Sequence, residues 1–283
     1  MSRRKTAFVT GASRGIGAES AVALARCGYD VAITARTAVA GEAHDHVGKV
    51  SALPGSLSLT ADAIRREGGR ALPLQADILD ETAMHGAAEA ALAEFGAIDL
   101  LFNNAVYQGD GNLANVMDVQ RGQIESIMQG NFYTPLALVR SLLPAMLDQG
   151  GGTIINMVSY TAFNNPPAPA DKGGWSFAYP ASKAALARMA GSLRVEHAGS
   201  GLRCFNLEPG TVLTEVMKTA GITEEVLKRY RPCKPAAIAA VVAWLAENEP
   251  HADWGADELL RGPFIAKQLD LLDQPSFMEK VNE

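Results

Sequence analysis

The chain has 283 residues, of which 48% are hydrophobic and 20% are charged, and its formal net charge is -6 at pH 7. This composition is typical of a folded globular protein, and the negative charge disfavours general binding to nucleic acid or to anionic membranes. The three cysteines are too few and too scattered for a disulfide framework or a metal site, and the lack of a signal or transmembrane stretch predicts a cytoplasmic protein.

Apolar runs without polar alternation recur along the chain and predict strands that are covered on both faces. These runs are 6–10, 30–34, 71–76, 98–105, 152–159 and 202–209. Helical patterns lie near 16–27, 58–68, 80–95, 118–148, 179–199 and 235–248. The alternation predicts an α/β fold, a Rossmann-type doubly wound parallel sheet with helices on both faces. Because no break in composition marks a second domain, residues 1–283 are expected to form one.

Four segments are expected to be insertions that form loops near the substrate. They are 37–56, 107–116, 160–178 and 212–231. Each follows a predicted strand, at the edge where open α/β sheets bind their ligands. His44 and His46 lie in the first of them and are interpreted as solvated loop residues, because no further metal ligands accompany them.

The stretch "TGASRGIG", residues 10–17, joins the first predicted strand to the first predicted helix. Glycines at such a junction let backbone N–H groups approach a pyrophosphate at the positive end of a helix. A glycine-rich string alone is weak evidence, but the strand before it and the helix after it are the context that the motif requires. The loop therefore predicts a dinucleotide site with contacts from Gly11, Ser13, Arg14, Gly15, Ile16 and Gly17.

The end of the second predicted strand indicates which dinucleotide binds. An NAD site usually has an acidic residue here, about 20 residues beyond the loop, that binds the ribose 2′-hydroxyl. This chain has Ala35 and Arg36 instead, and Arg14 lies within the loop. Because arginine forms bidentate bonds with phosphate oxygens, the pair predicts a preference for NADP(H) over NAD(H). Asp77, after the third strand, either binds the adenine amino group or caps a turn.

Several short motifs occur together and in a fixed order between about residues 10 and 215. They are "TGASRGIG", "NNA" at 103–105, Asn131 in "GNFYTP", Ser159 in "IINMVS", "YPASK" at 179–183 and "EPGTVLT" at 208–214. Together they resemble the short-chain dehydrogenase/reductase family in its single-domain form. The resemblance implies a nicotinamide cofactor and a Ser-Tyr-Lys-Asn active site.

Tyr179 and Lys183 stand at positions i and i+4 of a predicted helix, so they share one face. Tyr179 would be the general acid/base, and Lys183 would stabilise its phenolate and lower its pKa. Ser159 would donate a hydrogen bond to the substrate oxygen. By resemblance, Lys183 also binds the nicotinamide ribose, and Asn131 holds a water that links Lys183 to solvent. A Tyr-Lys pair is often only a surface contact, but Ser159 and the glycine loop argue for catalysis.

The resemblance adds further cofactor contacts, although each of these also has a structural reading as sheet support or as a simple turn. They are Ile78, Asn104, Ala105, Pro209, Gly210, Val212 and Thr214, with Tyr179 and Lys183 themselves. The chain departs from the family pattern in "NNAV" and in the 20 residues between Ser159 and Tyr179. It also lacks a clear glycine-rich ending.

The aromatic residues of the long 160–178 loop are candidates for substrate contacts. They are Tyr160, Phe163, Trp175 and Phe177, and their character favours a hydrophobic substrate. They could equally belong to the core or to a subunit contact.

The sequence as a whole predicts an NADP-dependent oxidoreductase that interconverts a carbonyl and a secondary alcohol. The alternatives are an NAD-linked alcohol dehydrogenase of the same family and a non-catalytic nucleotide-binding scaffold. A nucleotide-sugar epimerase or dehydratase is disfavoured, because the glycine spacing and the chain length resemble the single-domain branch and no extra C-terminal substrate domain is evident. By resemblance, helices 118–148 and 179–199 would meet across a subunit interface, giving a homodimer or homotetramer.

Overall fold

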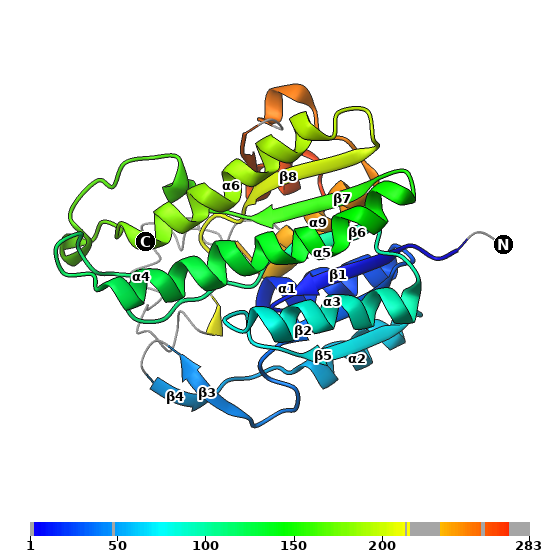
Figure 1. Cartoon of the computed structure of the whole chain (residues 1–283), viewed down its shortest axis with the longest axis horizontal. Coiled ribbons are helices and arrows are strands. Elements are labelled where there is room, and N and C mark those ends of the chain that lie inside the picture. The colour runs from blue at the N-terminus through cyan, green and yellow to red at the C-terminus, as the bar shows by residue number, and fades with distance from the viewer. Residues whose placement is uncertain (1–2, 47–48, 213, 216–232, 256–257, 272–283) are drawn as a thin grey trace, which may run out of the picture.

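A seven-stranded sheet runs through the centre of the computed structural model, which describes residues 3–46, 49–212, 214–215, 233–255 and 258–271 (Figure 1). The strands lie in the order β5-β2-β1-β6-β7-β8-β9, and every pairing is parallel. Their bounds are β1 Thr6–Thr10, β2 Asp30–Ala35, β5 Ala71–Gln75, β6 Leu100–Asn103, β7 Gly152–Met157, β8 Leu202–Glu208 and β9 Leu260–Arg261. The order reverses between β1 and β6, which is where an open α/β sheet forms its ligand crevice.

Helices cover both faces of this sheet, as the alternation of strands and helices predicts. Helices α3, α5 and α6 pack on the face that is nearer the viewer in Figure 1, and α1, α2, α9 and α10 pack on the other face. Their bounds are α1 Gly15–Arg26, α2 Leu57–Arg66, α3 Glu81–Phe95, α4 Arg121–Met128, α5 Thr134–Asp148, α6 Ala178–Glu196, α9 Pro235–Glu247 and α10 Gly262–Gln268. The doubly wound fold is therefore confirmed.

The burial of β1 explains why its sequence shows no polar alternation. Successive side chains of a strand point to opposite faces of the sheet. Ala7 and Val9 pack into the core beneath α1 and α9, whereas Phe8 packs into the core beneath α3 and α5. Because both faces are covered, apolar residues are favoured at every position of the strand.

The 37–56 segment differs from the expected loop, because part of it forms a hairpin. Strands β3 (Ala43–His46) and β4 (Lys49–Ala52) pair antiparallel, with Ala43 opposite Ala52. The hairpin projects from the body of the domain at the lower left of Figure 1. His44 and His46 therefore lie on a strand, and the His44 Nε2 is 3.7 Å from a carboxylate oxygen of Glu42.

The single helix that the sequence predicts over 118–148 is two α-helices joined by a π-helical turn. The turn, η1 (Gln129–Tyr133), separates α4 from α5 and contains Asn131. Wide turns of this kind are rare and occur frequently at functional sites. Short 3₁₀ turns, η2 (Tyr160–Ala162), η3 (Ala170–Lys172) and η4 (Ala252–Trp254), complete the described elements.

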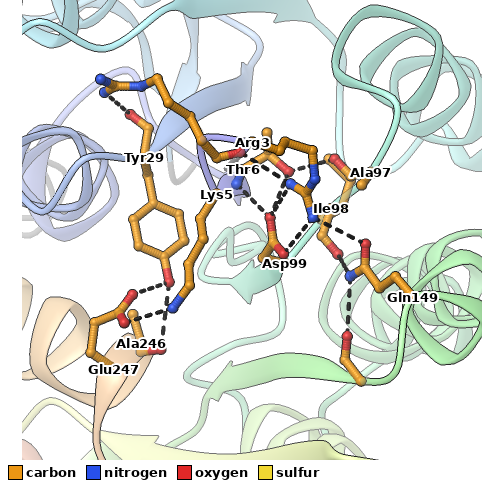
Figure 2. Close-up of polar contacts among 12 residues, drawn as sticks. Arg3, Lys5, Thr6, Tyr29, Ala97, Ile98, Asp99, Gln149, Ala246 and Glu247 are labelled. Atoms are coloured by element: carbon orange, nitrogen blue, oxygen red, sulfur yellow. Dashed lines mark hydrogen bonds and ion pairs between the residues drawn. The ribbon is translucent and has the colours of Figure 1, made fainter. Parts of the chain in front are cut away.

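Charged and polar side chains tie together the amino ends of the strands (Figure 2). The Asp99 carboxylate accepts two hydrogen bonds from Arg3, at 2.7 and 2.8 Å, and one from the backbone N–H of Thr6, at 2.7 Å. Tyr29 and Lys5 each donate to Glu247 at 2.6 Å, which joins the start of the sheet to the end of α9. These groups lie at the edge of the sheet opposite the ligand crevice, so we assign them to stabilising the fold rather than to binding.

Within the residues that the structure describes, no helix combines the length and the apolarity needed to cross a bilayer.

Candidate active site

A cleft of about 640 Å³ lies along the carboxyl ends of the strands. Its walls come from the segments that follow β1, β2, β5, β6, β7 and β8. All the residues that the sequence predicts as cofactor contacts line this cleft, together with Ser159. The structure thus brings together positions that are spread over some 200 residues of the chain, because parallel strands deliver their following loops to one edge.

The glycine loop packs too closely against its neighbours for larger residues. Gly11 has a φ of +67°, a region that favours glycine. A Cβ on Gly17 would lie 2.3 Å from the carbonyl oxygen of Gly11 and 2.6 Å from Nδ2 of Asn104. Asn104 in turn donates to the carbonyl oxygen of Thr10 at 2.8 Å. The N-terminus of α1 therefore presents backbone without a bulky side chain to the cleft, which suits the binding of a pyrophosphate by backbone N–H groups.

Two arginines and a carboxylate meet at one end of the cleft. Arg14 and Arg36 both line it, and Nε of Arg36 is 3.9 Å from a carboxylate oxygen of Asp77. Asp77 also accepts a hydrogen bond from the backbone N–H of Leu79 at 2.9 Å, so it caps the turn after β5. The capping role that was one alternative for Asp77 is present, and its side chain also lies at the adenosine end.

Ser159, Tyr179 and Lys183 meet at the other end of the cleft. Ser159 and Tyr179 both line the cleft, and the Ser159 hydroxyl acts to lower the pKa of Tyr179. Lys183 is 1% exposed, and its Nζ donates to the carbonyl oxygen of Met157 at 2.8 Å and lies 6.0 Å from the centroid of the Tyr179 ring. Helix α6 positions the tyrosine and lysine on one face, and the end of β7 supplies the serine.

Burial dominates the protonation of this pair. It raises the pKa of Tyr179 to about 12, against the hydrogen bond from Ser159, which lowers it. Burial also lowers the pKa of Lys183 to about 7. The sequence predicted that Lys183 would pull the pKa of the phenol down. In the structure burial acts in the opposite direction, and the role of Lys183 in tuning Tyr179 stays a prediction.

Asn131 lies behind the cleft rather than on its wall. Its side chain is fully buried in the π-helical turn, accepts a hydrogen bond from the backbone N–H of Tyr107 at 2.8 Å and donates to Oγ of Ser182 at 3.1 Å. It therefore joins the loop after β6 to α6, next to Lys183. The predicted water relay through Asn131 stays a prediction.

Glu208 is a site residue that the sequence analysis missed. It ends β8, lines the cleft and is 8% exposed. Its Oε1 accepts a hydrogen bond from the backbone N–H of Gly210 at 2.8 Å, which fixes the turn at Pro209. Burial raises the pKa of Glu208, and its negative charge adds to the effect of burial in raising the pKa of Tyr179. Its place near the end of the predicted strand 202–209, as the first residue of "EPGTVLT", was the available signal.

The aromatic residues of the 160–178 loop lie elsewhere than expected. Phe163, Trp175 and Phe177 line a second cavity of about 750 Å³, and Tyr160 packs edge-on against Trp175 with ring centroids 6.4 Å apart. The second cavity also touches Ala184 of α6, which is not among the residues that line the catalytic cleft. These described aromatic residues do not line the 640 Å³ cleft, and their role as substrate contacts stays a prediction.

Most of the fourth predicted insertion, residues 216–231, lies outside the described residues. Across the parts of the chain that are described, no group of three or more His, Cys, Asp or Glu side chains is arranged to hold a metal ion.

The family model for short chain dehydrogenase matches residues 5–225. The chain is 31% identical to the short chain dehydrogenase asqE of Emericella nidulans, over 92% of this chain and 94% of that protein. Among solved structures, it is similar to a 7α-hydroxysteroid dehydrogenase complexed with NADH and 7-oxo glycochenodeoxycholic acid, with a TM-score of 0.72, 26% identity and coverage of 92% of each chain. It is also similar to a metagenomic short-chain oxidoreductase in complex with NADP, with a TM-score of 0.67, 29% identity and coverage of 91% and 96%.

Proposed function

Because this chain belongs to the short-chain dehydrogenase family and is an NAD(P)-dependent oxidoreductase that acts on CH–OH groups, we propose that it uses NADP(H) to interconvert a carbonyl and a secondary alcohol. We further propose that Tyr179 is its general acid/base. The main support is the convergence of Ser159, Tyr179 and Lys183 in the cleft that the glycine loop also lines.

The residues of the cleft fit a nicotinamide dinucleotide. The close approach of Gly17 to Gly11 leaves bare backbone at the helix N-terminus, where the pyrophosphate would bind. Pro209, Gly210, Val212 and Thr214 also line the cleft and would hold the nicotinamide end. When bound, the cofactor supplies or accepts the hydride.

The chain's own residues would handle the proton. In carbonyl reduction, the Tyr179 hydroxyl would donate its proton to the substrate oxygen while the Ser159 hydroxyl donates a hydrogen bond to the same oxygen. In alcohol oxidation, the Tyr179 phenolate would take the proton back. Since burial raises the pKa of Tyr179 to about 12, the phenol carries the proton at neutral pH that the reduction direction requires.

The preference for NADP(H) is supported by Arg14 and Arg36 and by the absence of a carboxylate at the end of β2, where Ala35 stands. Relatives of known structure bind either cofactor, since one is complexed with NADH and another with NADP. An NAD-linked alcohol dehydrogenase is therefore the competing proposal.

An apolar substrate is supported by the side chains around the catalytic end of the cleft. Val106, Met157, Val158 and Val212 line it beside Ser159 and Tyr179. Apolar walls with a few convergent polar groups are typical of sites that bind hydrophobic molecules. A hydrophobic ketone or alcohol is the substrate class that we propose.

We also propose that residues 1–283 form one domain and that the chain assembles as a homodimer or homotetramer. One sheet with a core on each face supports the single domain. Val116 and Met117, which are 63% and 92% exposed just before α4, support a subunit contact there.

The function can be tested by following the absorbance of the reduced nicotinamide band with a panel of ketones, diketones and secondary alcohols. We expect turnover of at least one hydrophobic member, with kcat/KM for NADPH exceeding that for NADH by about tenfold or more, because two arginines would bind the 2′-phosphate. A higher kcat/KM with NADH would favour the NAD-linked alternative. Cofactor binding without turnover of any member would favour a scaffold.

Replacing Glu208 with Gln tests how the acid/base is tuned. The amide keeps an oxygen for the N–H of Gly210 but removes the negative charge that raises the pKa of Tyr179. Alcohol oxidation needs the phenolate, so we expect the rising limb of its pH–rate profile to move to lower pH in the variant. The measurement is kcat/KM for alcohol oxidation across pH, with the dissociation constant of NADPH as the control. Identical profiles would show that Glu208 does not act on Tyr179.

A further inference from the structure

Both arginines at the adenosine end of the cleft are held by the 37–56 insertion. Arg36 stands directly before it, and Nη2 of Arg36 donates to the carbonyl oxygen of Asp45 on β3 at 3.2 Å. Asp45 itself lines the cleft. The hairpin therefore supplies an acceptor that orients a guanidinium from the end of β2.

Arg14 donates hydrogen bonds to both ends of the same segment. Its Nε donates to the carbonyl oxygen of Pro54 at 2.9 Å, and its Nη2 donates to Oγ1 of Thr37 at 3.0 Å and to the carbonyl oxygen of Gly55 at 3.4 Å. These bonds use only two of the three guanidinium nitrogens. Within the described residues, the third, Nη1, makes no hydrogen bond and is available to a ligand oxygen.

The insertion also packs directly on the glycine loop. A Cβ on Gly55 would lie 2.4 Å from the carbonyl oxygen of Ser13, and Gly55 has a φ of +95°. Just beyond the insertion, Thr60 of α2 donates to the carbonyl oxygen of Ala12 at 2.8 Å. The backbone of the insertion and that of the phosphate loop are thus fixed relative to each other.

This arrangement brings two positive charges together. Burial is the main cause that lowers the pKa of Arg14. The positive charge of Arg36 lowers this pKa as well, whereas the negative charge of Glu215 raises it. Asp77 partly offsets Arg36 at 3.9 Å. Two guanidiniums held near one another in a half-buried site are complementary to a dianion such as a phosphate monoester.

We propose that the 37–56 insertion is a positioning element for the cofactor's 2′-phosphate, with Thr37, Asp45, Pro54 and Gly55 holding Arg14 and Arg36 in place. This inference rests on the proposed use of NADP(H), and it assigns the selectivity to the segment that orders the arginines as well as to the arginines themselves. An arginine that is already ordered loses less side-chain entropy when the phosphate binds.

The test uses two probes that differ only in the 2′-phosphate, adenosine 2′,5′-bisphosphate and 5′-AMP, titrated calorimetrically into the full chain. Thr37→Val removes one acceptor of Arg14 without changing the side chain's shape. A second variant replaces residues 44–51 with Gly-Gly, which the direct pairing of Ala43 with Ala52 allows. Val50→Ser, at a 76% exposed position of the hairpin, is the matched control, and Arg14→Ala/Arg36→Ala is the reference for complete loss.

We expect each of the two insertion variants to raise the dissociation constant of the bisphosphate about fivefold while changing that of 5′-AMP less than about twofold. The reference variant should raise the bisphosphate constant by about 10²-fold, and the control should match the parent chain. If the reference variant loses selectivity while both insertion variants keep it, the positioning role is wrong and the NADP(H) proposal survives. If the reference variant keeps its selectivity, the NADP(H) proposal itself fails. Retained 5′-AMP binding shows that a variant is folded.

Discussion

Replacing Tyr179 with Phe is expected to lower kcat/KM for ketone reduction by about 10²–10⁴-fold while leaving the dissociation constant of NADPH nearly unchanged. The Tyr179 phenol lies in the cleft beside Ser159, and phenylalanine keeps the ring while removing the hydroxyl proton. Since Lys183 and the glycine loop are unaltered, the cofactor should still bind.

The comparison needs steady-state rates with the best ketone of the panel and a fluorescence titration with NADPH. Tyr133→Phe is a suitable control, because Tyr133 is 47% exposed and is absent from the lining of the cleft. Its activity should equal that of the parent chain. A Tyr179→Phe variant whose kcat/KM stays within about tenfold of the parent would overturn the role of Tyr179 as acid/base.

Replacing Gly17 with Ala is expected to raise the dissociation constants of NADPH and NADH together, by about 10²-fold. The added Cβ would lie 2.3 Å from the carbonyl oxygen of Gly11, so backbone at the start of α1 must move. The change acts on the pyrophosphate site that both cofactors share, and so it should not alter the preference between them.

A second glycine provides the matched control for this substitution. Gly86 lies on the exposed face of α3, and a Cβ there would meet no atom within 4 Å. Gly86→Ala should leave cofactor binding unchanged and stabilise the fold by roughly 0.5–1 kcal/mol, because alanine is the better helix former. Thermal unfolding of both variants separates a binding defect from a folding defect. Unchanged NADPH affinity in Gly17→Ala would mean that the loop does not bind the pyrophosphate.

The parallel strands could be predicted from the sequence because burial on both faces leaves a continuous apolar run. The run at 6–10 has the same bounds as β1. The β3–β4 hairpin gave no such signal, since its residues "AHDH" and "KVSA" are mostly polar. The π-helical turn gave no signal either, and the Asn131 within it hydrogen-bonds to Tyr107 and Ser182, which are distant in sequence.

The residues that line the cleft could be predicted because position after a strand decides which edge of the sheet a residue reaches. The same reasoning did not predict which cavity the aromatic residues of the 160–178 loop line. Phe177 and Pro180 flank Tyr179 in sequence, yet they line the second cavity, because neighbouring residues at the start of a helix point in different directions. The protonation of Tyr179 was also beyond sequence reasoning, since it depends on burial that only the fold creates.

The π-helical turn also constrains how the length of this region can change in evolution. The five residues Gln129–Tyr133 widen the helix, so α4 and α5 do not share one 3.6-residue register. Deleting a single residue within α4 or α5 would rotate everything beyond it by about 100°, and a core face would turn toward solvent. Deleting one residue of the wide turn would instead let it close to α spacing while α4 and α5 keep their orientation. The cost there would be the turn itself, from which the Asn131 side chain reaches Oγ of Ser182. A length change in this region is therefore expected to be tolerated best at the turn, at the expense of the Asn131 contact.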